Sequence, residues 1–345
     1  MSSRAAQDDV GRTYDVISKW PTANKTLNPF SLEDGVLYVS GEKTAEAWDI
    51  NAGKRLWVHQ LQRPGNFRPR LGDGIVLFGG RNGYTAINQK NGEVLWTHFP
   101  TVELAVPFIH QGRVHFGDKH KLHTLDLKTG KELWTFETDS RASIWYAPTA
   151  KDDDLFLGAG DGFLYTLNPA DGSLKWKVNH EDQWQYLRQI YVSGDILLSG
   201  GYKDDLYGID YKNKGKILWR YYSGNFINSQ LVHKGAVYFW SPKGWIYARS
   251  VKTGKQNWRH QTTNYRSNSK KKNWASVMSE LVADEDNVYV LDMRSDLHVL
   301  DLKRGKLVGE YSLPDTMRPF LTLVPGTKRI FFGTTDGVIM DIRMK

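Results

Sequence analysis

One spacing recurs seven times along this chain of 345 residues: a glycine stands four residues before a position that is usually tryptophan. In the first copy Gly53 precedes Trp57, and Asp49 stands four residues before the glycine. The seventh copy keeps its glycine but has Gly309 where tryptophan is expected. The tryptophans of the other copies are Trp57, Trp96, Trp134, Trp176, Trp219 and Trp258. A repeat of about 40 residues predicts one supersecondary unit per copy.

Short segments typical of β-strands surround each copy, and no helical pattern separates them. An apolar run such as Val36 to Val39 leads through a turn into a second strand that ends at the Asp or Asn position. The glycine then falls where a tight turn needs a positive φ, and a third strand carries the tryptophan. Another short strand, such as Phe30 to Leu32, precedes each apolar run. Four short strands in roughly 40 residues predict one blade of a β-propeller.

The tryptophans are best explained as packing residues. A four-stranded blade of this size cannot bury both faces alone, so blades must stack around an axis. An indole ring is large enough to fill the wedge between neighbouring blades, and its burial should contribute about 3 kcal/mol or more. We therefore predict a structural docking role for these rings and for Trp20, which belongs to the closing blade described next.

The two ends of the sequence predict how the ring closes. The last unit begins near Pro319, ends at Asp341 and lacks a tryptophan strand, whereas the segment from Tyr14 to Trp20 supplies an unpaired one. Pairing them would complete an eighth blade and remove an exposed sheet edge. The sequence thus predicts an all-β fold, a single eight-bladed β-propeller of four-stranded antiparallel blades over residues 13–345. Residues 1–12 are expected to form a flexible tail.

Composition excludes several classes of function. Without cysteine the chain can form no disulfide, thiolate metal site or cysteine nucleophile. No apolar run approaches the roughly 20 residues that span a bilayer. Met1 to Gly11 is polar and lacks the apolar core of a secretory signal, which fits either a cytoplasmic protein or a chain whose leader has been removed. The net charge of +8 makes an acidic partner plausible without establishing one.

The repeat pattern, best preserved at Ala47 to Trp57, Thr124 to Trp134 and Ala248 to Trp258, resembles that of pyrroloquinoline-quinone-type propellers. Among these, an isolated eight-bladed propeller of this length is similar to the BamB family of outer-membrane protein assembly lipoproteins. The resemblance implies a scaffold of the periplasm or cell envelope, not an enzyme and without cofactor. It would dock another protein, such as an outer-membrane barrel assembly component.

The candidate partner-binding residues lie in loops that join a tryptophan strand to the innermost strand of the next blade. Loops carried on a rigid scaffold often hold recognition sites, and arginine and aromatic residues dominate interface energetics. The predicted residues are Arg68, Arg70, Arg141, Trp145, Trp184, Arg188, Asn228, Arg266, Trp274 and Arg318. An equally weighted interpretation is that several arginines satisfy backbone carbonyls around the channel. The segment Ser140 to Pro148 is similar in character to a docking loop of the BamB family.

Four histidines, His110, His115, His120 and His123, cluster on a predicted hairpin and the strand before it. Imidazoles across a hairpin can bind zinc or nickel, but this spacing fits no closed site. We therefore predict exposed histidines and no metal. No catalytic residues were identified, since no Ser–His–acid spacing is discernible.

Two other functions remain as alternatives. The chain could be a quinoprotein-like ligand-binding or dehydrogenase domain, because those enzymes share the fold. It could also bind a polyanion, either nucleic acid or acidic polysaccharide, through a basic channel mouth. Nucleic acid is the less favoured partner, because +8 is a modest charge for a dedicated nucleic-acid protein of this length.

Overall fold

The computed structural model describes residues 14–179, 189–200, 205–222, 230–240, 245–261, 281–292 and 295–345. Within these ranges the regular structure is β-strand, apart from the short 3-10 helix η1 (Asp139–Arg141). None of the described helical structure is long and apolar enough to cross a membrane. The predicted tail, residues 1–12, lies outside the described residues.

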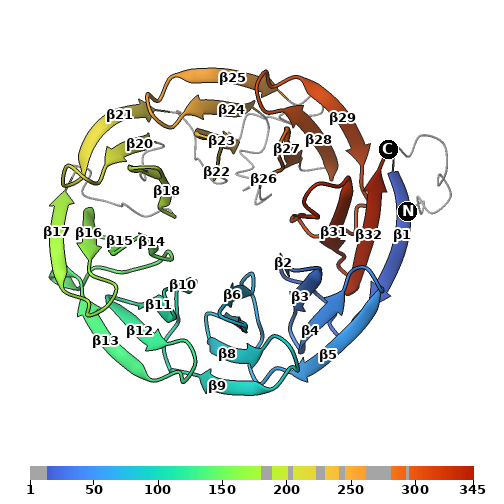
Figure 1. Cartoon of the computed structure of the whole chain (residues 1–345), viewed down its shortest axis with the longest axis horizontal. Helices are drawn as coiled ribbons and strands as arrows, with labels where there is room; N and C mark the ends of the chain where they lie inside the picture. The colour runs from blue at the N-terminus through green and yellow to red at the C-terminus, as the bar shows by residue number, and fades with distance from the viewer. Residues whose placement is uncertain are drawn as a thin grey trace, which may run out of the picture.

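The described strands form eight antiparallel sheets of four strands, arranged in a closed ring (Figure 1). Within blades 1 to 7 the strands run from the axis outward in chain order. Blade 1 contains β2 (Ser31–Glu33), β3 (Val36–Ser40), β4 (Thr44–Asp49) and β5 (Lys54–Gln60), and blade 2 contains β6 (Arg70–Gly72), β7 (Ile75–Gly80), β8 (Gly83–Asn88) and β9 (Val94–His98). Blade 3 contains β10 (Phe108–His110), β11 (Arg113–Asp118), β12 (Lys121–Asp126) and β13 (Glu132–Glu137). Blade 4 contains β14 (Thr149–Lys151), β15 (Asp154–Gly158), β16 (Phe163–Leu167) and β17 (Leu174–Asn179). Blade 5 contains β18 (Tyr191–Ser193), β19 (Ile196–Gly200), β20 (Asp205–Asp210) and β21 (Lys216–Tyr222). Blade 6 contains β22 (Gln230–His233), β23 (Ala236–Trp240), β24 (Trp245–Ser250) and β25 (Gln256–Gln261). Blade 7 contains β26 (Val282–Ala283), β27 (Asn287–Leu291), β28 (Asp296–Asp301) and β29 (Leu307–Ser312).

Blade 8 is built from both ends of the chain. It contains β30 (Thr322–Leu323), β31 (Arg329–Gly333) and β32 (Val338–Met344), with β1 (Tyr14–Pro21) as its outermost strand. The strands β1 and β32 are antiparallel, with Tyr14 opposite Met344 and Pro21 opposite Val338. This arrangement confirms the predicted eight-bladed all-β fold and its closure by the N-terminal strand.

The recurring glycine supports both a turn and a neighbouring ring. The seven repeat glycines have φ between 62° and 80°, where side chains other than hydrogen are strained. Each one also faces the tryptophan of the preceding blade, and a Cβ added to Gly305 would lie 2.4 Å from the Trp258 ring. The ring and glycine pairs are Trp20–Gly53, Trp57–Gly92, Trp96–Gly130, Trp134–Gly172, Trp176–Gly215, Trp219–Gly254 and Trp258–Gly305. The four-residue spacing therefore lets each of blades 1 to 6 receive one tryptophan ring and supply another to the next blade.

Hydrogen bonds fix these rings across the seams between blades. The indole N–H of Trp96 donates to the Leu127 carbonyl, and that of Trp258 donates to the Leu302 carbonyl, each at 2.8 Å. A buried N–H needs such a partner, because leaving it unpaired would cost free energy. The rings thus combine apolar packing with a specific polar contact to the next blade.

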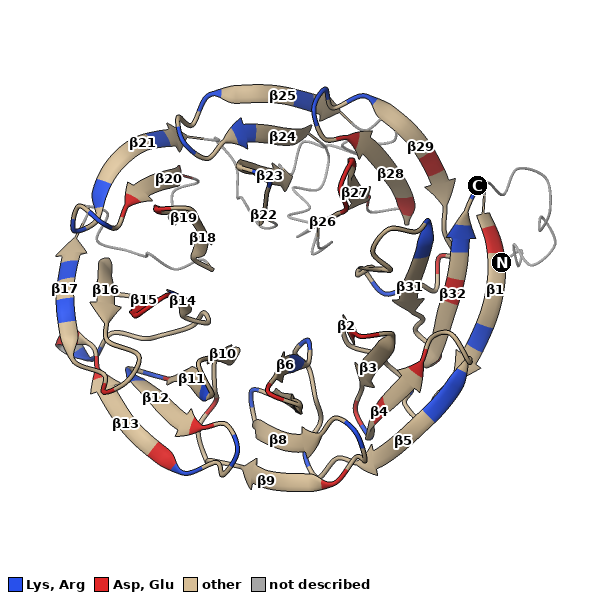
Figure 2. Cartoon of the chain, viewed as in Figure 1, with Lys and Arg blue, Asp and Glu red and all other residues tan. Residues whose placement is uncertain are grey.

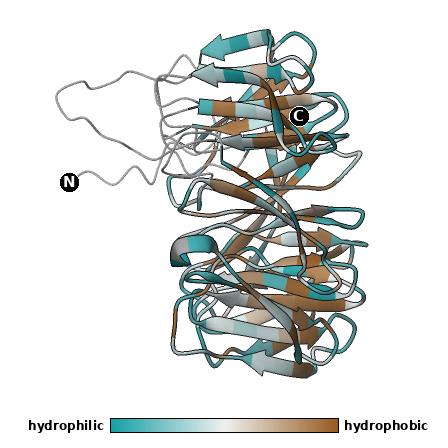
Figure 3. Cartoon of the chain, turned by 90° about the vertical axis from the view of Figure 1, so that its left-hand side faces the viewer, coloured by the Kyte–Doolittle hydropathy of each residue, from teal (hydrophilic) through white to brown (hydrophobic). Residues whose placement is uncertain are grey.

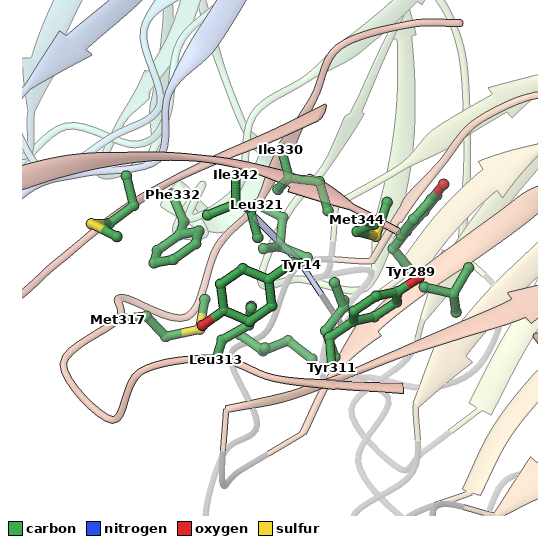
Figure 4. Close-up of a cluster of buried hydrophobic side chains, with 14 residues drawn as sticks. Tyr14, Tyr289, Tyr311, Leu313, Met317, Leu321, Ile330, Phe332, Ile342 and Met344 are labelled. Atoms are coloured by element: carbon green, nitrogen blue, oxygen red, sulfur yellow. The ribbon is translucent and has the colours of Figure 1, made fainter. Parts of the chain in front are cut away.

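The seam between blades 7 and 8 is filled differently, because Gly309 occupies the tryptophan position. Tyr311, two residues later, and Tyr14 of β1 lie in a buried cluster with Tyr289 (Figure 4). Leu313 and Met317 complete the lower part of the cluster in that view. The closing strand therefore contributes an aromatic ring to the one repeat seam that lacks its tryptophan.

The strands run between two faces of the ring, seen edge-on in Figure 3. Because neighbouring strands are antiparallel, the connections between blades share one face with the turns between the second and third strands, and we call it the loop face. Backbone bonds tie these segments together: Leu61 N–H donates to Lys43 O at 2.8 Å, and Ala105 N–H to Gly117 O at 2.9 Å. The repeat glycine turns lie on the opposite face, which we call the turn face.

Candidate functional site

Three of the predicted arginines bridge neighbouring blades on the inner side of the ring. Arg68, which precedes the inner strand of blade 2, donates through Nη1 to the Phe30 carbonyl of blade 1. Arg70 donates from Nε to the Pro107 carbonyl next to blade 3 at 3.1 Å. Arg318 of blade 8 donates from Nε to Leu27 O of blade 1 at 3.2 Å. In these three contacts the arginines donate to backbone carbonyls, as in the interpretation that gives them a structural role around the channel.

The segment from Thr138 to Pro148, between β13 and β14, forms a well-anchored loop on the loop face. Thr138 N–H donates to the His120 carbonyl at 3.0 Å, and its hydroxyl donates to Ala142 O at 2.7 Å. The Ile144 side chain is buried, and its N–H donates to Lys119 O at 2.5 Å. On the far side of the exposed residues, Ala147 is buried and its carbonyl accepts from Gln189 Nε2 at 3.4 Å. The side chains of residues 145 and 146 are therefore presented from an anchored backbone. We call this segment the docking loop.

The docking loop exposes an aromatic pair and a cation. Trp145 is 55% exposed and Tyr146 is 41% exposed, and Trp145 is the one exposed tryptophan in the described part of the chain. The Arg141 side chain is 73% exposed, with Nε 3.6 Å from Glu137 Oε1. The same Nε lies 3.2 Å from His120 Nε2. Exposed tryptophan, tyrosine and arginine side chains on one loop are the residue types in which interface hot spots are enriched.

The other five predicted partner-binding residues belong to three further connections between blades. They fall in connections between blades 4 and 5, 5 and 6, and 6 and 7. Trp184, Arg188, Asn228, Arg266 and Trp274 all lie outside the described residues. The described candidate surface is therefore the docking loop with Arg141 and Trp145.

The histidines expected to be exposed are in fact buried or half-buried. His115 is fully buried, and its Nδ1 lies 2.8 Å from the Thr124 hydroxyl. His123 lies 2.7 Å from Glu132 Oε2, and His110 Nε2 lies 2.8 Å from the Asp152 carbonyl. Within the described ranges, no group of three or more histidine or carboxylate side chains could hold a metal ion. The prediction of exposure was wrong at His115 because β11 is a central strand of its blade whose four middle residues are all buried. The other three are half-buried because they contact neighbouring groups, including Asp152, Glu132 and Glu137.

We expect the buried His115 to make the fold sensitive to acid. Burial, together with the charges of His110 and Arg113, lowers the pKa of His115 from 6.5 to about 3. Below the ordinary pKa the unfolded chain binds a proton that the folded chain excludes, so stability falls as the pH drops toward the folded value. The free energy of unfolding can be measured in urea at about pH 6 and at about pH 4.5. Between these two values it should fall by about 2 kcal/mol less in His115→Gln than in the native chain. Parallel stability curves for the two chains would contradict this assignment.

A hollow of about 640 Å³ lies among the inner strands, lined in part by Arg68, Tyr191, Asp284 and Glu285. Both carboxylates are already bound. Asp284 accepts from the Tyr289 hydroxyl at 2.5 Å and from two backbone N–H groups, while Glu285 pairs with Lys234 at 2.5 Å. Calcium needs several free oxygen ligands. The described donors of this hollow therefore do not fit a calcium-bound quinone.

A family comparison identifies the repeat. The model of the family described as outer membrane protein assembly factor BamB matches residues 18–113, 101–191 and 162–343. The chain belongs to the BamB family. A BamB from Moranella endobia is 22% identical over 277 residues, which cover 65% of this chain and 68% of that protein.

Two further curated relatives, one of them outside the BamB family, share shorter segments with this chain. Tetrathionate hydrolase from Acidithiobacillus ferrooxidans is 25% identical over 162 residues, which cover 40% of this chain. That match covers 32% of the hydrolase. A BamB from Marinobacter adhaerens is 30% identical over 94 residues, which cover 27% of this chain and 23% of that protein. The chain thus spans about a third or less of these curated relatives.

Solved structures agree with the BamB-like ring. BamB from Moraxella catarrhalis has a TM-score of 0.74 at 16% identity, covering 96% of this chain and 98% of that chain. A quinohemoprotein alcohol dehydrogenase from Pseudomonas putida has a TM-score of 0.73 at 10% identity, covering 96% of this chain and 76% of that chain. At these identities the likeness shows the fold alone, so it does not separate scaffold from enzyme.

Proposed function

We propose that this chain is a non-catalytic docking scaffold of the bacterial cell envelope that supports assembly of outer-membrane β-barrel proteins. The observation that carries the proposal is the BamB family match, which extends from residue 18 to residue 343. The proposed site of action is the periplasmic side of the envelope, where such a scaffold would meet its partner. A protein component of the barrel assembly machinery is the proposed partner.

The docking loop supports this proposal as the contact surface. Its anchored backbone lowers the ordering cost of binding, because the loop is already held in one conformation. The exposed Trp145 and Tyr146 offer apolar area with few rotatable bonds, and Arg141 adds a cation. A rigid ring also supports the proposed scaffold role. Its neighbouring blades are held together at their inner edges by Arg68, Arg70 and Arg318.

Capture of partners from the bacterial envelope tests the proposal. The full chain, tagged and incubated with detergent-solubilised envelope from the bacterium that encodes it, should retain an outer-membrane barrel assembly component identifiable by mass spectrometry. Recovery of the chain alone, or of cytoplasmic proteins only, would argue against a scaffold of the envelope.

The docking loop makes a sharper prediction for the captured partner. Replacing Arg141 and Trp145 together with alanine should weaken binding by at least roughly 30-fold, because the loss of even one hot-spot side chain commonly costs about 2 kcal/mol. The matched control is Leu133→Ala, on β13 of the same blade and also exposed. Affinities measured by surface plasmon resonance should fall for the loop variant only. An equal effect in both variants would place the contact elsewhere.

A further inference from the structure

The seven glycine turns of the turn face differ in charge around the ring. Counted from the Asp, Asn or Ser position through the residue after the glycine, the turns of blades 1 to 4 carry no net charge in total. Each turn of blades 5, 6 and 7 carries +2. The cations of these three turns are Lys212, Lys214, Lys216, Lys252, Lys255, Lys303, Arg304 and Lys306. We call these eight residues the basic arc.

The basic arc is continuous and its charge is not neutralised locally. The three turns belong to consecutive blades and join β20 to β21, β24 to β25 and β28 to β29 (Figure 2). All eight side chains are exposed, and no ion pair joins them to a carboxylate in the described ranges. Asp301 accepts instead from the backbone N–H groups of Lys303 and Arg304, at 3.0 and 2.8 Å. Lys212 Nζ lies 4.8 Å from the centre of the Tyr211 ring, a contact that leaves its charge in place. The charges of the arc therefore remain available to an anionic surface.

The neighbours of the basic arc indicate which anion it suits. Leu218, Leu307 and Val308 are exposed aliphatic residues near the start of the outer strands that leave these turns. The three turns present no exposed aromatic ring for stacking, because Tyr211 is buried. Seven of the eight cations are lysines, which act as point charges and lack the planar fork of arginine. Surfaces that bind single-stranded nucleic acid typically add stacking rings, whereas lysines beside aliphatic side chains suit a membrane interface.

We propose that the turn face of blades 5 to 7 binds the surface of a membrane that contains anionic phospholipid. The lysines lie close to the headgroup phosphates, and the aliphatic side chains reach the edge of the acyl region. Each cation near such a surface adds a similar increment of attraction, so an arc of eight acts additively. The docking loop lies on the opposite face, so this proposal does not depend on the proposed function. A protein and a membrane could be bound at the same time.

Vesicle co-sedimentation tests the proposal with the full chain. The chain should sediment with vesicles of phosphatidylglycerol mixed with phosphatidylcholine, and not with vesicles of phosphatidylcholine alone. Binding should weaken at high salt, since the attraction is screened. No binding to the phosphatidylglycerol vesicles at low salt would overturn the proposal.

Charge reversal locates the surface. The triple variant K303E/R304E/K306E should bind at least about 100-fold more weakly, because each cation contributes roughly fivefold in partitioning. The matched control K90E/K128E/K131E makes the same charge change on exposed turn residues of blades 2 and 3. Equal losses in both variants would show that net charge, not the basic arc, drives binding.

A milder variant and competition with other anions test the membrane proposal further. Should K303E/R304E/K306E fail to fold by circular dichroism, the milder K212Q/K214Q/K252Q should still reduce binding strongly. Inorganic phosphate at concentrations matching the lipid headgroups should not displace the chain from vesicles; if it does, the surface binds free phosphate. Displacement by short double-stranded DNA at concentrations far below those of the lipid would likewise overturn the assignment to a membrane.

Discussion

Replacing Gly305 with alanine should lower the free energy of unfolding by roughly 2–5 kcal/mol. Two costs combine at this residue. Its φ is 66°, a backbone region that costs an alanine roughly 1–2 kcal/mol. The new Cβ would also lie 2.4 Å from two ring atoms of Trp258, so the ring or the turn must move. Urea denaturation of the purified chain measures the loss.

Gly235→Ala is the matched control, because it isolates the backbone cost. Gly235 has a φ of 72°, but an added Cβ would meet no atom within 4 Å. This variant should lose only roughly 1–2 kcal/mol. Equal losses at the two positions would mean that the Trp258 ring adjusts freely, and the ring would then not be a rigid wedge between blades 6 and 7.

The second large effect is expected at the seam where the ring closes. Asp341 is fully buried and accepts from Arg329 Nε at 2.8 Å and Nη2 at 2.6 Å. Ser18 of β1 donates to the same carboxylate at 3.0 Å, and Arg329 also donates to the Ile50 carbonyl of blade 1. Asp341→Ala leaves the guanidinium without its buried counter-ion. A loss of roughly 3–5 kcal/mol in the free energy of unfolding should follow.

A second ion pair on the same blade provides the comparison. Asp15 and Lys345 lie 2.8 Å apart, but their side chains are 63% and 59% exposed. Asp15→Ala should therefore change stability by only about 0–1 kcal/mol. Thermal unfolding of both variants compares them directly. A loss at Asp15 as large as that at Asp341 would indicate that any disturbance of β1 opens the ring, whatever the burial of the pair.

The repeated blades of this fold could be predicted because each repeat shows the same short spacing between a few residues in the sequence. In six of the seven copies the glycine and a tryptophan lie four residues apart. The strand from Tyr14 to Trp20 is recognisable as the missing member of the last blade. The ring itself imposes this repetition, since every seam must be filled by a similar group. The filling of the seam beside Gly309 could not be predicted, because Tyr14 and Tyr311 reach it from opposite ends of the chain.

The candidate site was less accessible to sequence reasoning, because its loops are not periodic. Arg68 and Arg141 looked equivalent in sequence, as arginines in connections between blades. In the structure Arg68 is bound to a carbonyl of the preceding blade, whereas Arg141 extends from the docking loop. Their difference depends on the path of each loop, which local residue types do not determine. The burial of His115 was missed for a related reason, since it depends on the packing of β11 against the neighbouring sheet.

The pairing of β1 with β32 also has a consequence for synthesis. Seven blades are each complete within one stretch of sequence, so each could form its own hairpins as the chain leaves the ribosome. The eighth joins β1, the most N-terminal strand of the ring, to β32, its most C-terminal strand. The circle can therefore close only after translation has passed Met344, and until then the earliest strand has no partner.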